Sequence, residues 1–143
     1  MNSFEHLELC MGTGFRFQVR YKDADFNSAM ADACEILHEA DRVFSLYKPE
    51  SPLSQLAAGK TSVANCPAEV IDIWDSCEDW SRLTDGWFSP FTAKHTFDPS
   101  GLVKSWAAKH AADALIAKGI VDFTLNAGGD VLVADQASGE FDW

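Results

Sequence analysis

The sequence predicts an α+β fold, in which a mixed, mainly antiparallel sheet packs against three helices. Two segments near the N-terminus, Phe4–Cys10 and Phe15–Tyr21, have the pattern of strands joined by a glycine turn. Three later stretches repeat apolar residues at helical spacing, and two short apolar strands around a second glycine turn follow them. The 143 residues suffice for one domain with a substantial core, so we expect a single domain over residues 1–143.

The first hairpin is predicted from the alternation of apolar and polar residues after the turn. Phe15, Phe17 and Val19 alternate with Arg16, Gln18 and Arg20, as in a strand with one buried face. Met11-Gly12-Thr13-Gly14 forms the turn. Its glycines serve the hairpin alone, or they let a ligand lie against the turn with Met11 as an adaptable apolar contact.

The first helix is expected from Phe26 to Phe44, where apolar residues step by four and three along the chain. His38 lies beside the apolar face and is interpreted as a boundary residue rather than a ligand. The segment from Ser45 to Leu56 is expected to be a loop, because its two prolines prevent the helix from continuing. Tyr47 in this loop either stacks on a flat ring or covers the core.

A second helix begins near Pro67 and Glu69. Its buried side is predicted to consist of Val70, Ile73, Cys77 and Trp80. Asp85-Gly86 ends it, with the glycine as C-cap. The aromatic residues in Trp87-Phe88-Ser89-Pro90-Phe91 then either plug the core or form one wall of a pocket for a planar ligand.

The third helix follows Asp98-Pro99-Ser100-Gly101, packs through Leu102, Trp106, Leu115 and several alanines, and stops at Gly119. A lysine in its first turn, Lys104, is mildly unfavourable unless an anion lies there. Gly101 permits close approach of a ligand, its carbonyl suits Mg²⁺, and Asp98 is placed to bind a polar ligand group or a metal. The alternative is an ordinary connection, with Asp98 or Ser100 as the cap and a snorkelling lysine.

Composition excludes several classes of function. A net charge of −11 argues against binding to nucleic acid or to an anionic membrane surface, and it implies a metal ion wherever a phosphorylated ligand is held. No apolar run of spanning length, secretory signal or lipid-attachment signal is present, so we expect a cytoplasmic protein. The four cysteines lack paired spacing and neighbouring histidines; we therefore expect free thiols rather than a zinc site.

Five short motifs together resemble the FAD:protein FMN transferase family, also called the ApbE family and once described as thiamine-biosynthesis lipoproteins. They are Met11-Gly12-Thr13, Ser45-Leu46-Tyr47 with Ser51, Gly86-Trp87-Phe88-Ser89-Pro90, Asp98 to Lys104, and Asn126 to Val131. The resemblance implies an enzyme that uses Mg²⁺ to split FAD at its pyrophosphate. It would join the FMN half, through a phosphoester, to a threonine or serine hydroxyl of a target flavoprotein.

The same resemblance implies roles for individual residues. FAD would be contacted by Met11, Tyr47, Trp87, Phe88, Ser89, Asp98 and Lys104. Lys104 would also be catalytic, and the carbonyl of Gly101 would bind the metal. The family commonly has an aspartate at the position of Ser89, a glycine at that of Ser105 and an asparagine near Ala57.

Members of this family continue past the strand expected at Phe141-Asp142-Trp143 into a region that completes their metal site. The chain is therefore expected to correspond to the N-terminal part of such an enzyme. The alternative interpretation is a non-catalytic FAD-binding or structural domain.

Overall fold

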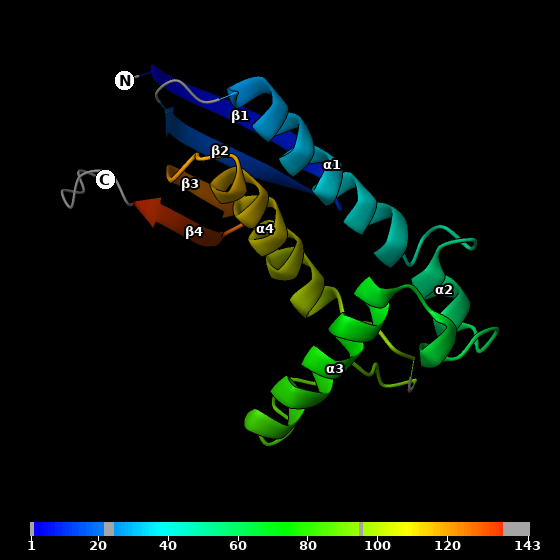
Figure 1. Cartoon of the computed structure of the whole chain (residues 1–143). Coiled ribbons are helices and arrows are strands. Elements are labelled where there is room, and N and C mark those ends of the chain that lie inside the picture. The colour runs from blue at the N-terminus through cyan, green and yellow to red at the C-terminus, as the bar shows by residue number, and fades with distance from the viewer. Residues whose placement is uncertain (1, 22–24, 95, 136–143) are drawn as a thin grey trace. The chain divides into compact units, whose positions relative to one another are not determined.

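The structure is a computed structural model of the whole chain, and it describes residues 2–21, 25–94 and 96–135 (Figure 1). These residues form two strands, a series of helices and two further strands. The chain divides into two compact units. The sheet unit comprises Met1–His38 and Ala107–Trp143, and the helical unit comprises Glu39–Trp106. The expectation of a single domain stays a prediction.

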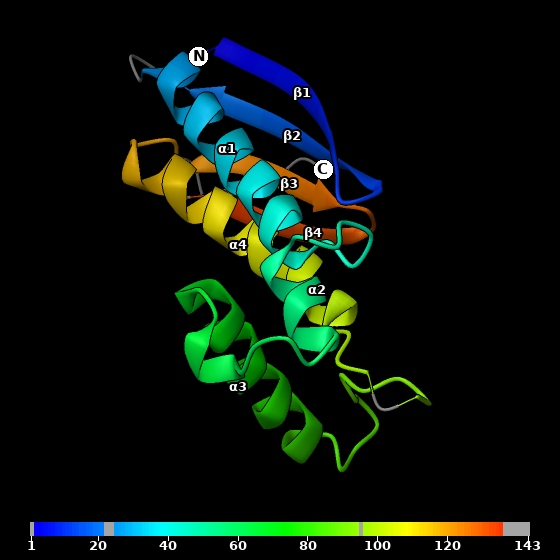
Figure 2. The same cartoon turned by 90° about the vertical axis from the view of Figure 1, so that its right-hand side faces the viewer.

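The sheet unit contains a four-stranded sheet in the order β1-β2-β3-β4 (Figure 2). Its strands are β1 (Asn2–Cys10), β2 (Thr13–Tyr21), β3 (Asp122–Ala127) and β4 (Asp130–Asp135). Every neighbouring pair in this sheet is antiparallel, which confirms the α+β class and leaves no parallel pair among the described strands. The two predicted hairpins are therefore both present.

The predicted alternation of apolar and polar residues along β2 is confirmed, and its apolar side chains form part of the core of the sheet unit. Phe15, Phe17 and Val19 of β2 are buried, while the polar residues between them are exposed. Phe123 and Leu125 of β3 are also buried, and Leu125 lies opposite Phe17. Burial of such large side chains contributes about 1.5–3 kcal/mol each. The sheet therefore presents one strongly apolar face.

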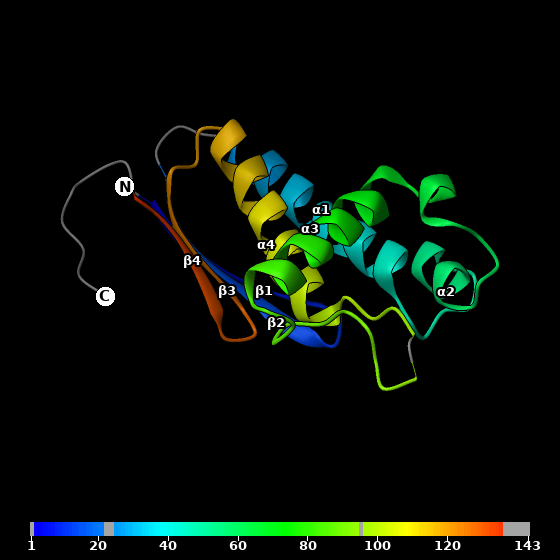
Figure 3. The same cartoon turned by 90° about the horizontal axis from the view of Figure 1, so that it is seen from below.

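Two helices cover that face (Figure 3). The helix α1 (Phe26–Phe44) begins and ends as predicted, and α4 (Ser100–Ala117) contributes a row of buried small residues to the sheet unit. Lys118, just past α4, forms an ion pair with Asp32 of α1 at 3.1 Å. The buried alanines of α4 are Ala107, Ala108, Ala111 and Ala112.

The helical unit contains α2 (Pro52–Ala57), a short 3₁₀ helix η1 (Val63–Asn65) and α3 (Ala68–Leu83). The helix α2 begins within the segment Ser45 to Leu56, so the expectation of a loop is wrong for residues 52–56. Ser51 caps this helix, and Pro52 occupies its first position, where proline is tolerated. Trp80 is 49% exposed, so its predicted place on the buried side of α3 is wrong. Helical phase does not explain this exposure, because Trp80 lies only about 20° around the helix axis from the buried Ile73, seven residues earlier. Trp80 belongs to the last turn of α3, which ends at Leu83.

None of the four cysteines, all of which lie among the described residues, forms a disulfide bond. Burial raises the pKa of the Cys77 thiol to about 11, so this side chain behaves as a protonated core residue. Within the part of the chain that the structure describes, no helix has the length and apolar character needed to cross a membrane. The strand expected at Phe141-Asp142-Trp143 lies outside the described residues.

Candidate functional site

The predicted flavin contacts are divided between the two units. The sheet unit contains Met11, and the helical unit contains Tyr47, Trp87, Phe88, Ser89, Asp98, Gly101 and Lys104. The residues of the helical unit lie on three segments: the loop after α1, the segment after α3 and the start of α4.

Asp98 caps the N-terminus of α4. Its Oδ1 accepts a hydrogen bond from the N–H of Ser100 at 3.0 Å and a second from the Ser100 hydroxyl. The N–H groups of Leu102 and Val103 donate to the carbonyl of Pro99, at 2.8 and 3.1 Å. The structure thus shows the capping arrangement that the sequence left as an alternative. Most of the donors available at the start of a helix are already used by the protein itself.

Gly101 is the exception at this helix start. Among the described first-turn N–H groups, that of Gly101 alone has no protein acceptor. A Cβ atom placed on Gly101 would lie 3.5 Å from Cε2 of Phe88, which is ordinary van der Waals contact. The packing of the protein therefore does not require glycine at this position, although glycine weakens a helix by about 1 kcal/mol relative to alanine. A ligand that approaches the backbone closely would explain why position 101 is a glycine.

Lys104 was predicted to lie in the first turn of the helix. It is the fifth residue of α4 and therefore begins the second turn, so that prediction is wrong. Its own N–H belongs to the regular helix, and the influence of the helix dipole declines beyond the first turn. Long side chains on a helix tend to lie over the preceding turn, which for the half-buried Lys104 is the turn containing Gly101. The electrostatic argument for Lys104 consequently depends on side-chain reach more than on the dipole.

The segment after α3 is tied to the start of α4 by its backbone. Thr84 Oγ1 accepts a hydrogen bond from the N–H of Phe88 at 2.9 Å, and the carbonyl of Pro90 accepts one from Asp98 N–H at 2.7 Å. Phe91 and Phe97 pair in an antiparallel bridge. These bonds explain how Phe88 comes to lie beside Gly101.

The aromatic residues after α3 have different surroundings. Phe91 and Trp74 both contact Phe97, with ring centroids 5.9 and 4.6 Å away, and so belong to a small aromatic cluster. Trp87 is 93% exposed, and Ser89 is exposed with its hydroxyl accepting the N–H of Phe91 at 3.2 Å. The predicted wall of a pocket for a planar ligand stays a prediction. A hollow of about 300 Å³, at the small end of ligand sites, is lined by Cys77, Glu78, Ser81, Arg82, Pro90 and Phe91.

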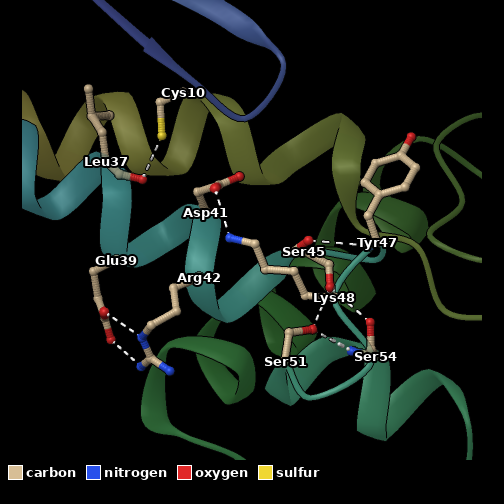
Figure 4. Close-up of polar contacts among 10 residues, drawn as sticks. All are labelled: Cys10, Leu37, Glu39, Asp41, Arg42, Ser45, Tyr47, Lys48, Ser51 and Ser54. Carbon is tan, nitrogen blue, oxygen red and sulfur yellow. Dashed lines mark hydrogen bonds and ion pairs between the residues drawn. The ribbon is translucent and has the colours of Figure 1, made fainter.

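The loop after α1 presents Tyr47 from a hydrogen-bonded turn (Figure 4). The carbonyl of Ser45 accepts hydrogen bonds from the hydroxyls of Ser51 and Ser54, the latter at 2.9 Å. Lys48 forms an ion pair with Asp41 at 3.4 Å. Tyr47 itself is 97% exposed, so the turn holds its backbone while the ring stays available. Of the two predicted roles for this ring, covering the core is wrong.

Met11 occupies a strained position in the turn between β1 and β2. Its φ is 51°, and that of Gly12 is 70°. Two-residue hairpin turns of this kind favour asparagine or glycine, because other residues are rarely stable at positive φ. A half-buried methionine here has a conformational cost that hairpin formation alone does not explain.

Sequence reasoning missed Thr84, which positions a candidate contact, and it named Ser51 only as part of a motif, without its role as a helix cap. Thr84 orients the backbone of Phe88, and the buried Ser51 links the Tyr47 loop to α2. A serine directly before a proline is a helix-start signal and would have indicated α2. Thr84 has no comparable signal, because its role depends on how α3 ends.

The chain belongs to the ApbE family, whose model matches residues 11–96. This match includes Met11, Tyr47 and residues 87–89 but ends before Asp98, Gly101 and Lys104. No curated protein sequence matches the chain.

Solved structures show the same fold. The flavin transferase ApbE from Vibrio cholerae has a TM-score of 0.82 at 16% identity, with 99% of this chain and 62% of that protein covered. The ApbE protein from Thermotoga maritima gives 0.83 at 16% identity, with 99% and 62% covered. The flavinyl transferase ApbE from Pseudomonas stutzeri gives 0.80 at 14% identity, with 92% and 56% covered. The chain therefore spans less than two thirds of the length of each of these proteins.

Proposed function

We propose that the protein binds FAD and transfers its FMN half to a threonine or serine hydroxyl of a target flavoprotein. Membership of the ApbE family supports the general class of flavin transferase. The main support for the proposal within this chain is the N–H of Gly101, which has no protein acceptor among the described residues and lies beside Phe88 and three residues before Lys104. We also propose a cytoplasmic location, which cell fractionation tests.

The proposed binding roles follow from side-chain chemistry. Tyr47 and Trp87 offer exposed aromatic faces, which are energetically costly in water and suit stacking on flat rings. Lys104 would neutralise the diphosphate, and the N–H of Gly101 would donate to one of its oxygens. Met11 would supply a flexible thioether contact from the turn of the first hairpin.

The proposed reaction is a phosphoryl substitution. The acceptor hydroxyl oxygen bonds to the FMN phosphorus while the bond from that phosphorus to the bridging oxygen breaks. AMP leaves with that oxygen, and the hydroxyl loses its proton. Reactions of this type depend mainly on positioning and charge neutralisation, which is the part proposed for Lys104.

Mg²⁺ is part of the proposal, and the described residues fit it only incompletely. At the start of α4 they offer the carbonyl of Gly101 and the carboxylate of Asp98, which already caps the helix. Mg²⁺ prefers about six oxygen ligands, including water and substrate phosphates. When bound, the ion would neutralise diphosphate charge.

The test combines product detection with a point variant. The chain is incubated with FAD, MgCl₂ and a purified flavoprotein domain that contains a threonine flavinylation site. Transfer predicts a fluorescent acceptor band after denaturing electrophoresis and release of one AMP per flavin attached. Both signals should disappear in Lys104→Ala and persist in Lys109→Ala, a lysine of the same helix paired with Asp113. Unaltered FAD throughout would contradict transfer.

A non-catalytic flavin-binding protein is the second candidate. It is favoured by Ser89, which is an exposed hydroxyl where the family commonly has a carboxylate. This candidate predicts FAD binding that does not change when Mg²⁺ is chelated, with no AMP released. If a large excess of FAD does not raise the melting temperature, the chain is instead a structural domain.

A further inference from the structure

We propose that the sheet unit contains a binding site for a thiophilic transition-metal ion, Zn²⁺ or a similar divalent cation, formed by His6, Glu8 and Cys34. One ligand atom from each of these side chains lies within 4.8 Å of the others. Among the described residues, this is the only group of three such side chains gathered closely enough for one ion. The site is independent of the flavin surface and of the proposed transfer reaction.

The fold creates this cluster from two simple spacings. His6 and Glu8 are two residues apart on β1, so they project from the same face of the strand. Cys34 and His38 are four residues apart on α1, so they share one face of the helix. That strand face and that helix face meet, as the hydrogen bond from the Cys10 thiol to the carbonyl of Leu37 at 3.2 Å also shows.

The interatomic distances are close to those of a metal site. Cys34 Sγ lies 3.6 Å from His6 Nε2. Tetrahedral Zn²⁺, with bonds of about 2.3 Å to sulfur and 2.0 Å to nitrogen, places these two ligand atoms roughly 3.5 Å apart. No movement of the backbone is therefore needed for this pair.

Glu8 would have to move slightly. Its Oε2 accepts a hydrogen bond from His6 Nε2 at 2.7 Å. Two ligand atoms of this kind on one tetrahedral ion are about 3.4 Å apart, so the metal would replace the shared proton and separate them. A rotation of the carboxylate achieves this, because the Glu8 side chain is 22% exposed and the site lies near the surface.

His38 is a positioning residue for this site. Its Nε2 is 2.7 Å from Glu8 Oε1, the carboxylate oxygen that does not contact His6. A hydrogen bond from a second histidine fixes the orientation of a ligating carboxylate. Three protein ligands leave the fourth tetrahedral position to water.

The ligand set identifies the class of ion. A thiolate and an imidazole select Zn²⁺, Co²⁺ or a related metal over Mg²⁺, which prefers oxygen ligands alone. In the absence of metal, burial, followed by the neighbouring carboxylate of Glu8, raises the pKa of the Cys34 thiol to about 12.

Cobalt titration of the chain at pH 8, in the presence of a phosphine reductant, tests the proposal. A single Co²⁺ per chain should give thiolate-to-cobalt charge-transfer absorption in the near ultraviolet and intense visible bands of tetrahedral Co²⁺. Zn²⁺ should abolish both by displacement, whereas Mg²⁺ should not. Failure of the chain to bind either Co²⁺ or Zn²⁺ with one-to-one stoichiometry overturns the proposal.

Variants assign the ligands. Cys34→Ser should abolish the charge-transfer absorption, while Cys66→Ser, which changes a cysteine of the helical unit, should retain it. His38→Gln should retain the absorption but weaken binding by about 10–100-fold, as expected for an outer partner of a ligand. Circular dichroism checks that each variant is folded. If Cys34→Ser keeps the absorption, or if Cys66→Ser loses it, the assignment is wrong.

Discussion

Replacement of Gly101 by alanine should change the stability of the helix and the affinity for FAD in opposite directions. Gly101 lies in α4 without positive φ, so alanine is compatible with its backbone. The new methyl group would meet Cε2 of Phe88 at 3.5 Å, a favourable contact distance. Helix propensity favours alanine by up to about 1 kcal/mol, and the effect is smaller near a helix end.

We therefore expect Gly101→Ala to stabilise the protein by about 0.5–1 kcal/mol in chemical denaturation. For a chain of this size, that change corresponds to a rise in melting temperature of roughly 2–4 °C. If FAD approaches the backbone here, the same methyl group enters the space of the ligand. Overpacking of this kind costs about 1–3 kcal/mol, which is a 5- to 150-fold weaker Kd.

The assay pairs urea denaturation with a fluorescence titration of FAD. Ala31→Gly, at an exposed position of α1, is the calibrating control: it should lower stability by about 1 kcal/mol and leave FAD affinity unchanged. Two results would refute the reasoning. One is a destabilised Gly101→Ala protein; the other is a stabilised protein that binds FAD as tightly as the parent.

Three other substitutions or conditions give further expected outcomes. Met11→Asn should stabilise the first hairpin by about 1 kcal/mol, because asparagine tolerates positive φ, and should weaken FAD binding; unchanged affinity in the same titration would remove Met11 from the site. Lys104→Ala should weaken FAD binding by about 1.5–3 kcal/mol, the usual range for a charge-assisted hydrogen bond, whereas Lys109→Ala should not, as measured by calorimetry. Hydrogen bonds from His6, and then from His38, lower the pKa of Glu8 from 4.5. The ionised Glu8 therefore stabilises the folded protein fully above about pH 4.5, and this stabilisation is lost as the pH falls through the lower pKa of the folded state. Urea denaturation between pH 3 and 7 should therefore show a smaller acid loss in Glu8→Gln than in the parent chain.

Much of the fold was predictable because its elements have strong local patterns. The alternation around Phe17 and the helical spacing from Phe26 to Phe44 each identify an element without reference to the rest of the chain. The helix α2 was missed because prolines and serines in its segment favour loops on average, and the capping by Ser51 decided the outcome. Trp80 was misplaced because its helical spacing matches that of the buried residues, whereas its exposure depends on what packs against the last turn of α3.

The site was less predictable, because its features depend on contacts between distant segments. Nothing in the local sequence shows that Phe88 lies beside Gly101, since a threonine hydrogen bond and a short bridge determine the path between them. Linear spacing also disfavoured zinc, because His6 and Cys34 are far apart in the chain and meet only when β1 packs on α1. Residue types were readable from the sequence, but their proximity was not.

The positive φ of Met11 has a consequence for laboratory evolution. In a library that covers all codons at this position, a screen that scores only heat resistance should replace this methionine, since glycine, asparagine or aspartate tolerates the positive φ. A screen that scores flavin attachment should retain it. Parallel selections from the same library would therefore diverge at this codon, and the direction of divergence would show which requirement has kept a methionine there.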